Sequence, residues 1–176
     1  MMKKFIFTYF IFCFTLSLFG QGKANKLVEK GNEYLVSQNF AKAEDCYDRA
    51  LSIDSMCFEA YIQKSDFEIQ KSQFAKALEF INLARKYAEL KNVDNESMAH
   101  ILSIRSFIYF NLNNYQMAIQ DMDSAISLND QNSGYFFMRA LIRRMNSDLM
   151  GCCSDLKKAS NLGLEKAKES LTLYCK

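Results

Sequence analysis

A spacing of large and small apolar residues that recurs along the chain constrains its fold more than any other feature. In "YQMAIQDMDSAIS", residues 115–127, the ring of Tyr115 is followed by Ala118, Met122 and Ala125. Intervals of three and four residues place all of them on one face of a helix. The pattern occurs four times, and its last small residue returns after 34, 41 and 34 residues, at Ala50, Ala84, Ala125 and Ala159.

A second set of small residues repeats in the same register. Its members are Gly31, Ser65, Ser106 and Ala140, and each follows a large apolar residue by four positions: Leu27, Tyr61, Leu102 and Phe136. Small residues allow two helix backbones to approach closely, whereas Leu or Ile at the same places would hold the helices apart. We therefore expect helices that cross closely at these positions, with the rings of Phe40, Phe74 and Tyr115 filling the adjacent gaps. The absence of proline favours uninterrupted helices.

The period of 34 residues, with small residues at two helical sites, resembles the tetratricopeptide repeat. The resemblance covers about residues 24–164 and implies an all-α fold: a right-handed superhelical array of helix-turn-helix units with a C-terminal capping helix. We expect one domain over residues 23–176, with repeats at about 24–57, 58–91, 99–132 and 133–164 and a capping helix at 164–175. The extra residues 92–98 predict a lengthened loop or helix end, capped by Asp94 or Asn95.

The sequence departs from the family pattern at several positions. The proline that usually follows the second helix is replaced by Ser55, Glu89, Asp130 and Leu164. A tyrosine of the first helix, present at Tyr34 and Tyr109, is replaced by Glu68 and Arg143. These departures predict weaker turns and a weaker fourth repeat.

The first 22 residues have the layout of a secretory signal peptide. A basic start, "MMKK", precedes a charge-free apolar run over residues 5–19, and Gly20, Gln21 and Gly22 supply a cleavage site of small residues. We expect cleavage after Gly20 or Gly22 and an exported protein; the alternative is an uncleaved anchor. Lys3 and Lys4 lie in this segment, so the remainder has equal numbers of basic and acidic residues. That balance favours neither nucleic acid nor a membrane surface as a partner.

Residues for catalysis are scarce. His100 is the only histidine, and no glycine-rich phosphate loop occurs. The acidic pair in "DMD", residues 121–123, points in nearly opposite directions on a helix, so we interpret it as part of a solvated face. We expect neither an enzyme nor a site for a metal or another cofactor.

The resemblance implies that function lies on the concave face formed by the first helices, which in this family receives a peptide or a helix. The positions of the family's basic and amide clamp for carboxylates fall on Val28, Asn32, Gln63, His100 and Ile104, or, one repeat later, on Ile62, Asp66, Ile104, Gly134 and Met138. Only Asn32 matches, so the clamp is absent. We predict a groove for a protein or peptide partner lined by Asn32, Gln63, Asp66, His100, Ile104, Phe107, Phe137, Met138 and Leu141. The alternative is that several of the apolar residues pack between repeats.

The end of the chain resembles the closing unit of exported bacterial repeat proteins, which carry one cysteine in the last repeat and another near the terminus. If the capping helix forms, Cys153 and Cys175 lie on adjacent antiparallel helices about one turn out of level. Two alternatives follow: a disulfide between them, or free thiols. We expect Cys152 to be a buried small residue, with Cys46 and Cys57 remaining as thiols.

Two classes of function compete. The first is a non-enzymatic interaction module or scaffold of the cell envelope. The second is an exported redox protein that uses Cys152, Cys153 or Cys175. A low-pKa, exchangeable thiol would favour the second class.

Overall fold

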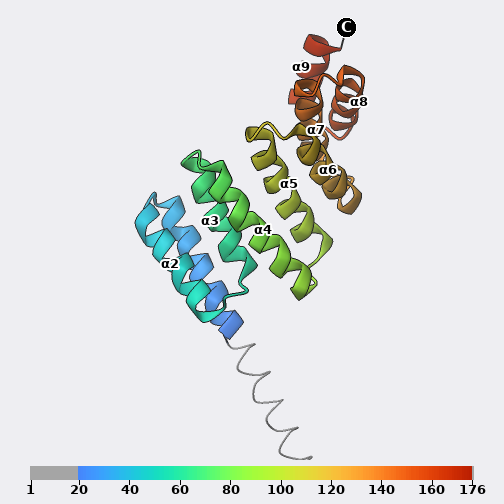
Figure 1. Cartoon of the computed structure of the whole chain (residues 1–176). Coiled ribbons are helices and arrows are strands. Elements are labelled where there is room, and N and C mark those ends of the chain that lie inside the picture. The colour runs from blue at the N-terminus through green and yellow to red at the C-terminus, as the bar shows by residue number, and fades with distance from the viewer. Residues whose placement is uncertain (1–19, 176) are drawn as a thin grey trace, which may run out of the picture. The chain divides into compact units, whose positions relative to one another are not determined.

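The computed structural model describes residues 20–175, which form nine helical segments and no strand (Figure 1). The all-α prediction is therefore confirmed. After a first helix over residues 20–36 come α2 (Phe40–Ile53), α3 (Phe58–Gln70), α4 (Phe74–Lys91), α5 (Asn95–Asn111), α6 (Tyr115–Leu128), α7 (Ser133–Met145), α8 (Leu149–Asn161) and α9 (Glu165–Tyr174). Residues 1–19, which include most of the predicted signal peptide, lie outside the described residues.

The chain divides into two compact units, Met1–Lys64 and Ser65–Lys176, with the boundary inside α3. In the second unit, neighbouring helices pack in chain order: α4 on α5, α5 on α6, α6 on α7, α7 on α8 and α8 on α9. None of the helices within residues 20–175 is both long and apolar enough to cross a membrane.

The turn inside each helix pair uses the same two positions in every repeat. A residue with positive φ ends the first helix at Gln38, Ser72, Asn113 and Ser147. The next residue begins the second helix, and at Asn39, Asn114 and Asp148 its side chain accepts the backbone N–H three positions later. Such caps satisfy an N–H group that the helix itself leaves unpaired.

The turns between pairs do not depend on proline. Asp54 Oδ1 accepts the backbone N–H of Met56 at 2.9 Å, and Asn129 Oδ1 accepts that of Gln131 at 3.1 Å. These local hydrogen bonds form the turn at equivalent positions after α2 and α6. At these two turns the side-chain hydrogen bonds therefore compensate for the missing proline, which the sequence predicts to weaken the turns.

The seven extra residues mainly lengthen helices. α4 has 18 residues and α5 has 17. Asn92 ends α4 in the left-handed region, and Asp94 caps α5 by accepting the N–H of Ser97 at 2.8 Å. The structure thus realises the predicted helix end rather than a long loop, and Asp94 rather than Asn95 is the cap.

The small residues lie where helices meet. All of the following have no exposed surface: Ala43, Ala50, Ala77, Ala84, Ala118, Ala125, Cys152 and Ala159. At Gly31 a Cβ atom would lie 2.4 Å from a ring carbon of Tyr47, so only glycine fits there. The expectation for the rings holds for Tyr115, which packs on the core around Ala118. It is wrong for Phe40, which is 49% exposed.

Two of the small residues also make a hydrogen bond between helices. Ser65 Oγ donates to the carbonyl oxygen of Ala77 at 3.1 Å, and Ser106 Oγ donates to that of Ala118 at 2.7 Å. Both serines are fully buried. A hydroxyl group at this position therefore joins the first helix to the second without holding them apart.

A buried ion pair joins α5 to α6. Arg105 Nε and Nη2 donate to the two carboxylate oxygens of Asp121 at 2.8 and 2.6 Å, and Nη1 donates to Asn82 Oδ1 of α4 at 3.1 Å. Burial lowers the pKa of Arg105, but Asp121 outweighs that effect and raises it above its usual value. One arginine thus bridges the second helices of consecutive pairs.

The same arrangement returns 34 residues later. Arg139 donates to both carboxylate oxygens of Asp155 at 2.9 and 2.7 Å and to Asp123 Oδ1 at 2.6 Å. In the first unit, Lys64 at the equivalent position donates to Asp48. The interpretation of "DMD" as a solvated face is therefore wrong for Asp121, which is buried.

The positions that lack the family's tyrosine carry ion pairs instead. Lys76 Nζ donates to Glu68 Oε1 at 2.9 Å, joining α4 to α3. Arg143 Nη1 donates to Asp155 Oδ2 at 2.9 Å, joining α7 to α8. Both replacements therefore contact the second helix of their own pair.

The capping helix α9 packs against α8. Ala167 of α9 is fully buried beside Leu156 and Ala159 of α8. Gly163, with φ of 90°, follows the end of α8, a position where glycine adopts the left-handed conformation without steric cost. The Cα atoms of Cys153 and Cys175 lie 5.7 Å apart.

The two aspartates of "DMD" provide a matched test of the buried pair. Asp121→Asn leaves Arg105 buried without its counter-charge and should lower the free energy of unfolding by about 3 kcal/mol. Asp123→Asn removes a half-exposed partner of Arg139, which keeps Asp155, and should cost less than about 1 kcal/mol. Urea unfolding followed by circular dichroism measures both. Equal losses of unfolding free energy in the two variants would contradict the claim that the buried pair of Arg105 and Asp121 is the more important one.

Candidate functional site

The second unit contains a cavity of about 400 Å³ on its first helices. Each helix contributes side chains at intervals of one, three or four residues, which share one helical face. The lining residues are Asp66 and Ile69 of α3; Ser103, Ile104 and Phe107 of α5; Met122 of α6; and Asn132, Gly134, Tyr135 and Met138 in and next to α7. Side chains of α3, α5 and α7 thus form an open, largely apolar groove.

Asp66 is the exception in this apolar lining. By the repeat register it is equivalent to Asn32, Phe107 and Leu141. Burial raises the pKa of Asp66 above its usual value, and the charge of His100 lowers it by less. No hydrogen bond to its carboxylate contributes to that balance. A carboxylate is therefore held in an apolar environment without a strong partner.

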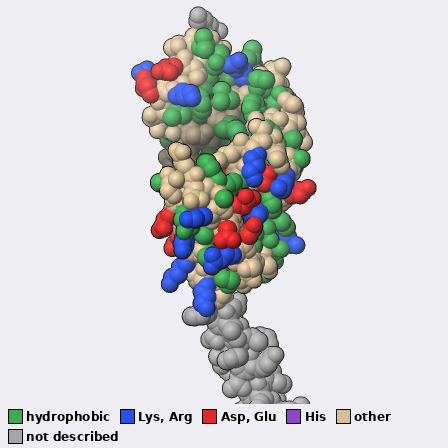
Figure 2. All heavy atoms as spheres, turned by 90° about the vertical axis from the view of Figure 1, so that its left-hand side faces the viewer, with side chains coloured by type: hydrophobic (Ala, Val, Ile, Leu, Met, Phe, Trp, Pro, Cys, Tyr) green, Lys and Arg blue, Asp and Glu red, His purple; other side chains and the backbone are tan. Residues whose placement is uncertain are grey.

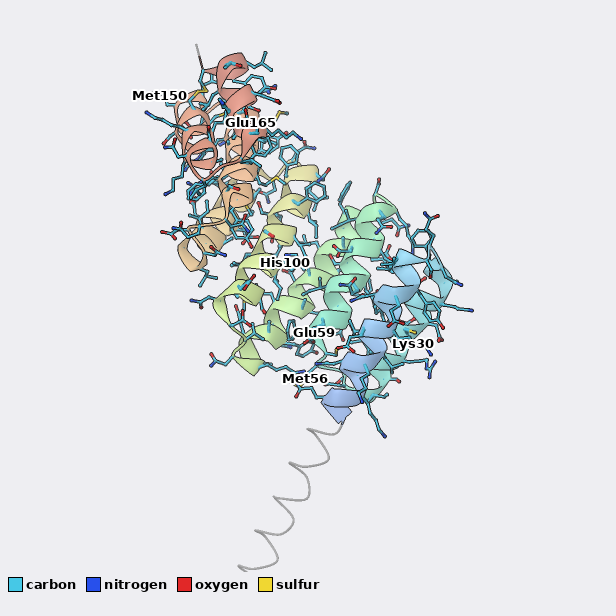
Figure 3. All side chains as sticks on the ribbon, turned by 180° about the vertical axis from the view of Figure 1, so that it is seen from behind. Lys30, Met56, Glu59, His100, Met150 and Glu165 are labelled. Carbon is cyan, nitrogen blue, oxygen red and sulfur yellow. A yellow bond between two sulfur atoms is a disulfide. The ribbon has the colours of Figure 1, made fainter. Side chains whose placement is uncertain are left out.

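A second, more polar cavity of about 390 Å³ adjoins the first. Its lining consists of Glu96, Ser97, His100, Asn129, Asn132 and Tyr135. Asn132 and Tyr135 belong to both cavities, so the groove continues from an apolar end at Phe107 to a polar end at His100. Figure 3 labels His100 on α5. Neither cavity is lined by a lysine or an arginine.

The structure brings together part of the predicted site. Asp66, Ile104, Phe107 and Met138 line the first cavity, and His100 lines the second. The other two polar candidates belong to the first unit. In that unit Asn32 Oδ1 accepts a hydrogen bond from the Tyr47 hydroxyl at 2.7 Å, and Gln63 is half-buried on α3.

Phe137 and Leu141 line neither cavity. Phe137 packs against the core formed by α7, α8 and α9, and Lys166 of α9 lies 5.7 Å from the centre of its ring. For Phe137 the structure therefore supports packing, which was the alternative for the apolar residues. Leu141 is half-buried on α7.

The predicted site lacked six residues that line the first cavity: Ile69, Ser103, Met122, Asn132, Gly134 and Tyr135. The signal for the first two was present. Ile69 follows Asp66 by three positions, and Ser103 lies next to Ile104, so an extension of each helical face would have included them. Tyr135 precedes two other aromatic residues, and its sequence position alone does not separate it from them.

The thiols give no support to a redox site. Cys152 is fully buried, and burial raises the pKa of its thiol, which reduces the reactive thiolate. Cys46 and Cys57 are also buried. Within residues 20–175, no group of three or more His, Cys, Asp or Glu side chains is arranged to hold a metal ion.

Comparisons with known proteins identify the repeat. The family model described as tetratricopeptide repeat matches residues 99–132, the range that the sequence predicts for the third repeat. A search of curated proteins found no match. Solved structures are also similar to this chain, and two of them are described as tetratricopeptide-repeat proteins.

Three of these structures illustrate the likeness. The MamA protein has a TM-score of 0.71 and 17% identity, over 86% of this chain and 80% of that chain. YrrB, described as a TPR protein with an unusual peptide-binding site, has a TM-score of 0.66 and 16% identity, over 78% and 67%. The N-terminal domain of stress-induced protein-1 (STI-1) from C. elegans has a TM-score of 0.56 and 21% identity, over 62% and 87%. At these identities the likeness concerns the fold.

The raised pKa of Asp66 predicts a pH-dependent cost to stability. The folded state binds the proton of Asp66 more tightly than the unfolded state, so this group's contribution to stability falls as pH rises from 3.8, its ordinary pKa, through the raised value. Asp66→Asn should therefore raise the melting temperature at pH 7, and the gain should shrink as pH approaches 4. Thermal unfolding of both proteins across this range measures the difference. An unchanged or lower melting temperature of Asp66→Asn at pH 7 would contradict the claim that the partly buried carboxylate lowers stability.

Proposed function

We propose that the chain is a non-enzymatic interaction module that binds a peptide or a helix of a partner protein. Its third repeat matches the tetratricopeptide-repeat family model, and solved structures, one of them described as a TPR protein, have a similar fold. The proposed site is the groove lined by α3, α5 and α7. The single observation that carries the proposal is the open apolar cavity on these first helices. A partner that covers it gains about 25 cal/mol for each Å² of apolar surface removed from water.

The lining and the charge pattern suit this kind of binding. Ile69, Ile104, Phe107 and Met138 offer apolar contacts, and Ser103, Asn132 and His100 offer hydrogen-bonding groups that can orient a backbone. On the face drawn in Figure 2, acidic and basic side chains lie close to one another. We therefore expect binding that depends weakly on salt. The peptide-binding site of YrrB, a protein of the same fold, is consistent with this use of the groove.

Substitutions of Phe107 and Phe137 test whether each residue binds a partner in the groove or packs in the core. Peptides selected from a phage-displayed random library on the protein should lose most of their affinity for Phe107→Ser, because Phe107 lines the cavity. Phe137→Ser should instead lower the melting temperature, because Phe137 packs against α9. Binding is measured by calorimetry and folding by circular dichroism. Peptides that bind Phe107→Ser normally, while it remains folded, would place the site elsewhere.

We further propose that the protein works in the cell envelope or outside the cell. The support is the sequence of residues 1–22, with its basic start, apolar run and small-residue cleavage site. The expected result is that N-terminal sequencing of the protein from its host begins after Gly20 or Gly22. A protein that retains residues 2–19 would contradict export with cleavage.

The pairing of Cys153 with Cys175 is part of the same proposal, since an oxidising compartment favours it. The support is a Cα–Cα distance of 5.7 Å between α8 and the end of α9. The bond closes a loop with a sequence separation of 22, which stabilises the folded state by about 3 kcal/mol in the chain-entropy model.

Reductant should therefore lower the melting temperature and expose α9 to hydrogen exchange before the other helices. The double variant Cys153→Ser, Cys175→Ser is the control, and its melting temperature should be low and insensitive to reductant. If both cysteines of the oxidised native protein react with a thiol reagent before reduction, the pairing is wrong.

A further inference from the structure

We propose that the groove selects a partner segment carrying an arginine or lysine side chain flanked by apolar residues, with Asp66 as the counter-charge. This inference rests on the proposed function and adds the chemical class of the ligand. It concerns the cavity formed by α3, α5 and α7 and its polar continuation at Glu96 and His100.

The first support is the sign of the charge in the groove. Asp66 is the only acidic residue lining the first cavity, and Glu96 lines the second. Lysine and arginine are absent from both linings, and His100 is the only basic residue among them. A cation from a partner would therefore find a carboxyl group at each end of the groove, whereas a partner carboxylate would find only His100.

The second support is the contrast between the partly buried Asp66 and the buried acidic residues of the second unit. Asp121 is bound by Arg105, Asp155 by Arg139 and Arg143, and Glu68 by Lys76 and Lys71. Among residues 20–175, no lysine or arginine acts on the pKa of Asp66, and the charge that does so is that of His100. The fold thus supplies a lysine or arginine to each of these carboxylates except the one in the groove.

The third support is the apolar wall beside the carboxylate. Ile69, Ile104 and Met138 can contact the aliphatic stem of an arginine or lysine, as such stems bury readily while the charged end seeks a polar group. The rings of Phe107 and Tyr135 can contact the cation itself. Two carboxylate oxygens suit the planar guanidinium group of arginine particularly well.

The desolvation cost of the Asp66 carboxylate in the unbound protein agrees with a role in binding. An apolar residue stands at the equivalent positions of the third and fourth repeats, Phe107 and Leu141. A carboxylate at this place pays a desolvation cost that an apolar side chain would avoid. A bound cation removes that cost, so part of the pairing energy appears only in the complex.

The test begins with a phage-displayed random peptide library selected in parallel on the wild-type protein and on Asp66→Asn. Peptides recovered on the wild type should be enriched in arginine or lysine next to apolar residues, and this enrichment should disappear on Asp66→Asn. The control is Glu79→Gln, which removes an exposed charge of α4 that lines neither cavity. Its selected peptides should match those of the wild type.

One recovered arginine peptide is then made with citrulline, the neutral isostere of arginine, at that position. Against the wild type, the citrulline change should weaken binding about tenfold, as should Asp66→Asn against the arginine peptide. Both changes together should cost no more than either alone, because they remove the same pair.

The outcomes distinguish recognition of a cation by Asp66 from the proposed binding of peptides in the groove. Peptides that need Phe107 but carry no cation, or that lose nothing on Asp66→Asn, would overturn the inference and leave groove binding in place. If no recovered peptide depends on Phe107, both are overturned. A tenfold coupled loss at Asp66, with Phe107 also required, supports both.

Discussion

The close approach of paired helices at buried small residues is the constraint on which the rest of the structure depends. Ala77 and Ala118 are fully buried, and the serine hydroxyls that face them bond to their carbonyl oxygens rather than filling space. Within the second unit, side chains of α3, α5 and α7 line one cavity. The second helices carry only small side chains at the crossing points, and this allows the first helices to lie close enough to form the groove.

A second constraint is the treatment of buried charge. Arg105 and Arg139 each bridge two second helices, so Asp121 and Asp155 are paired by residues of the fold itself. Buried pairs of this kind add little net stability, but losing one partner is costly, and they specify which helices meet. Against this background Asp66 in the groove is informative, because burial raises its pKa and only the charge of His100 acts against that rise.

The burial of the repeated small residues could be predicted from the sequence. The ion pairs and other contacts between particular side chains could not. Every small residue of the register is buried as expected, because a helical face and a repeat are both local patterns. The difference between Asp121 and Asp123 was missed, since it depends on which of two arginines lies opposite each carboxylate. Phe107 and Phe137 look alike in sequence, yet one lines the cavity and the other meets α9, whose position only the folded chain defines.

The measurement that tests the central claim most directly is the free energy of unfolding of two variants in the same helix. Ala77 of α4 is fully buried at the crossing with α3, and Ala75 is exposed two residues earlier. Ala77→Leu should lower the unfolding free energy by about 1–3 kcal/mol, because the extra methylene groups hold the helices apart. Ala75→Leu should leave it nearly unchanged. Equal effects of the two substitutions would contradict the account that close helix approach at small residues builds this fold.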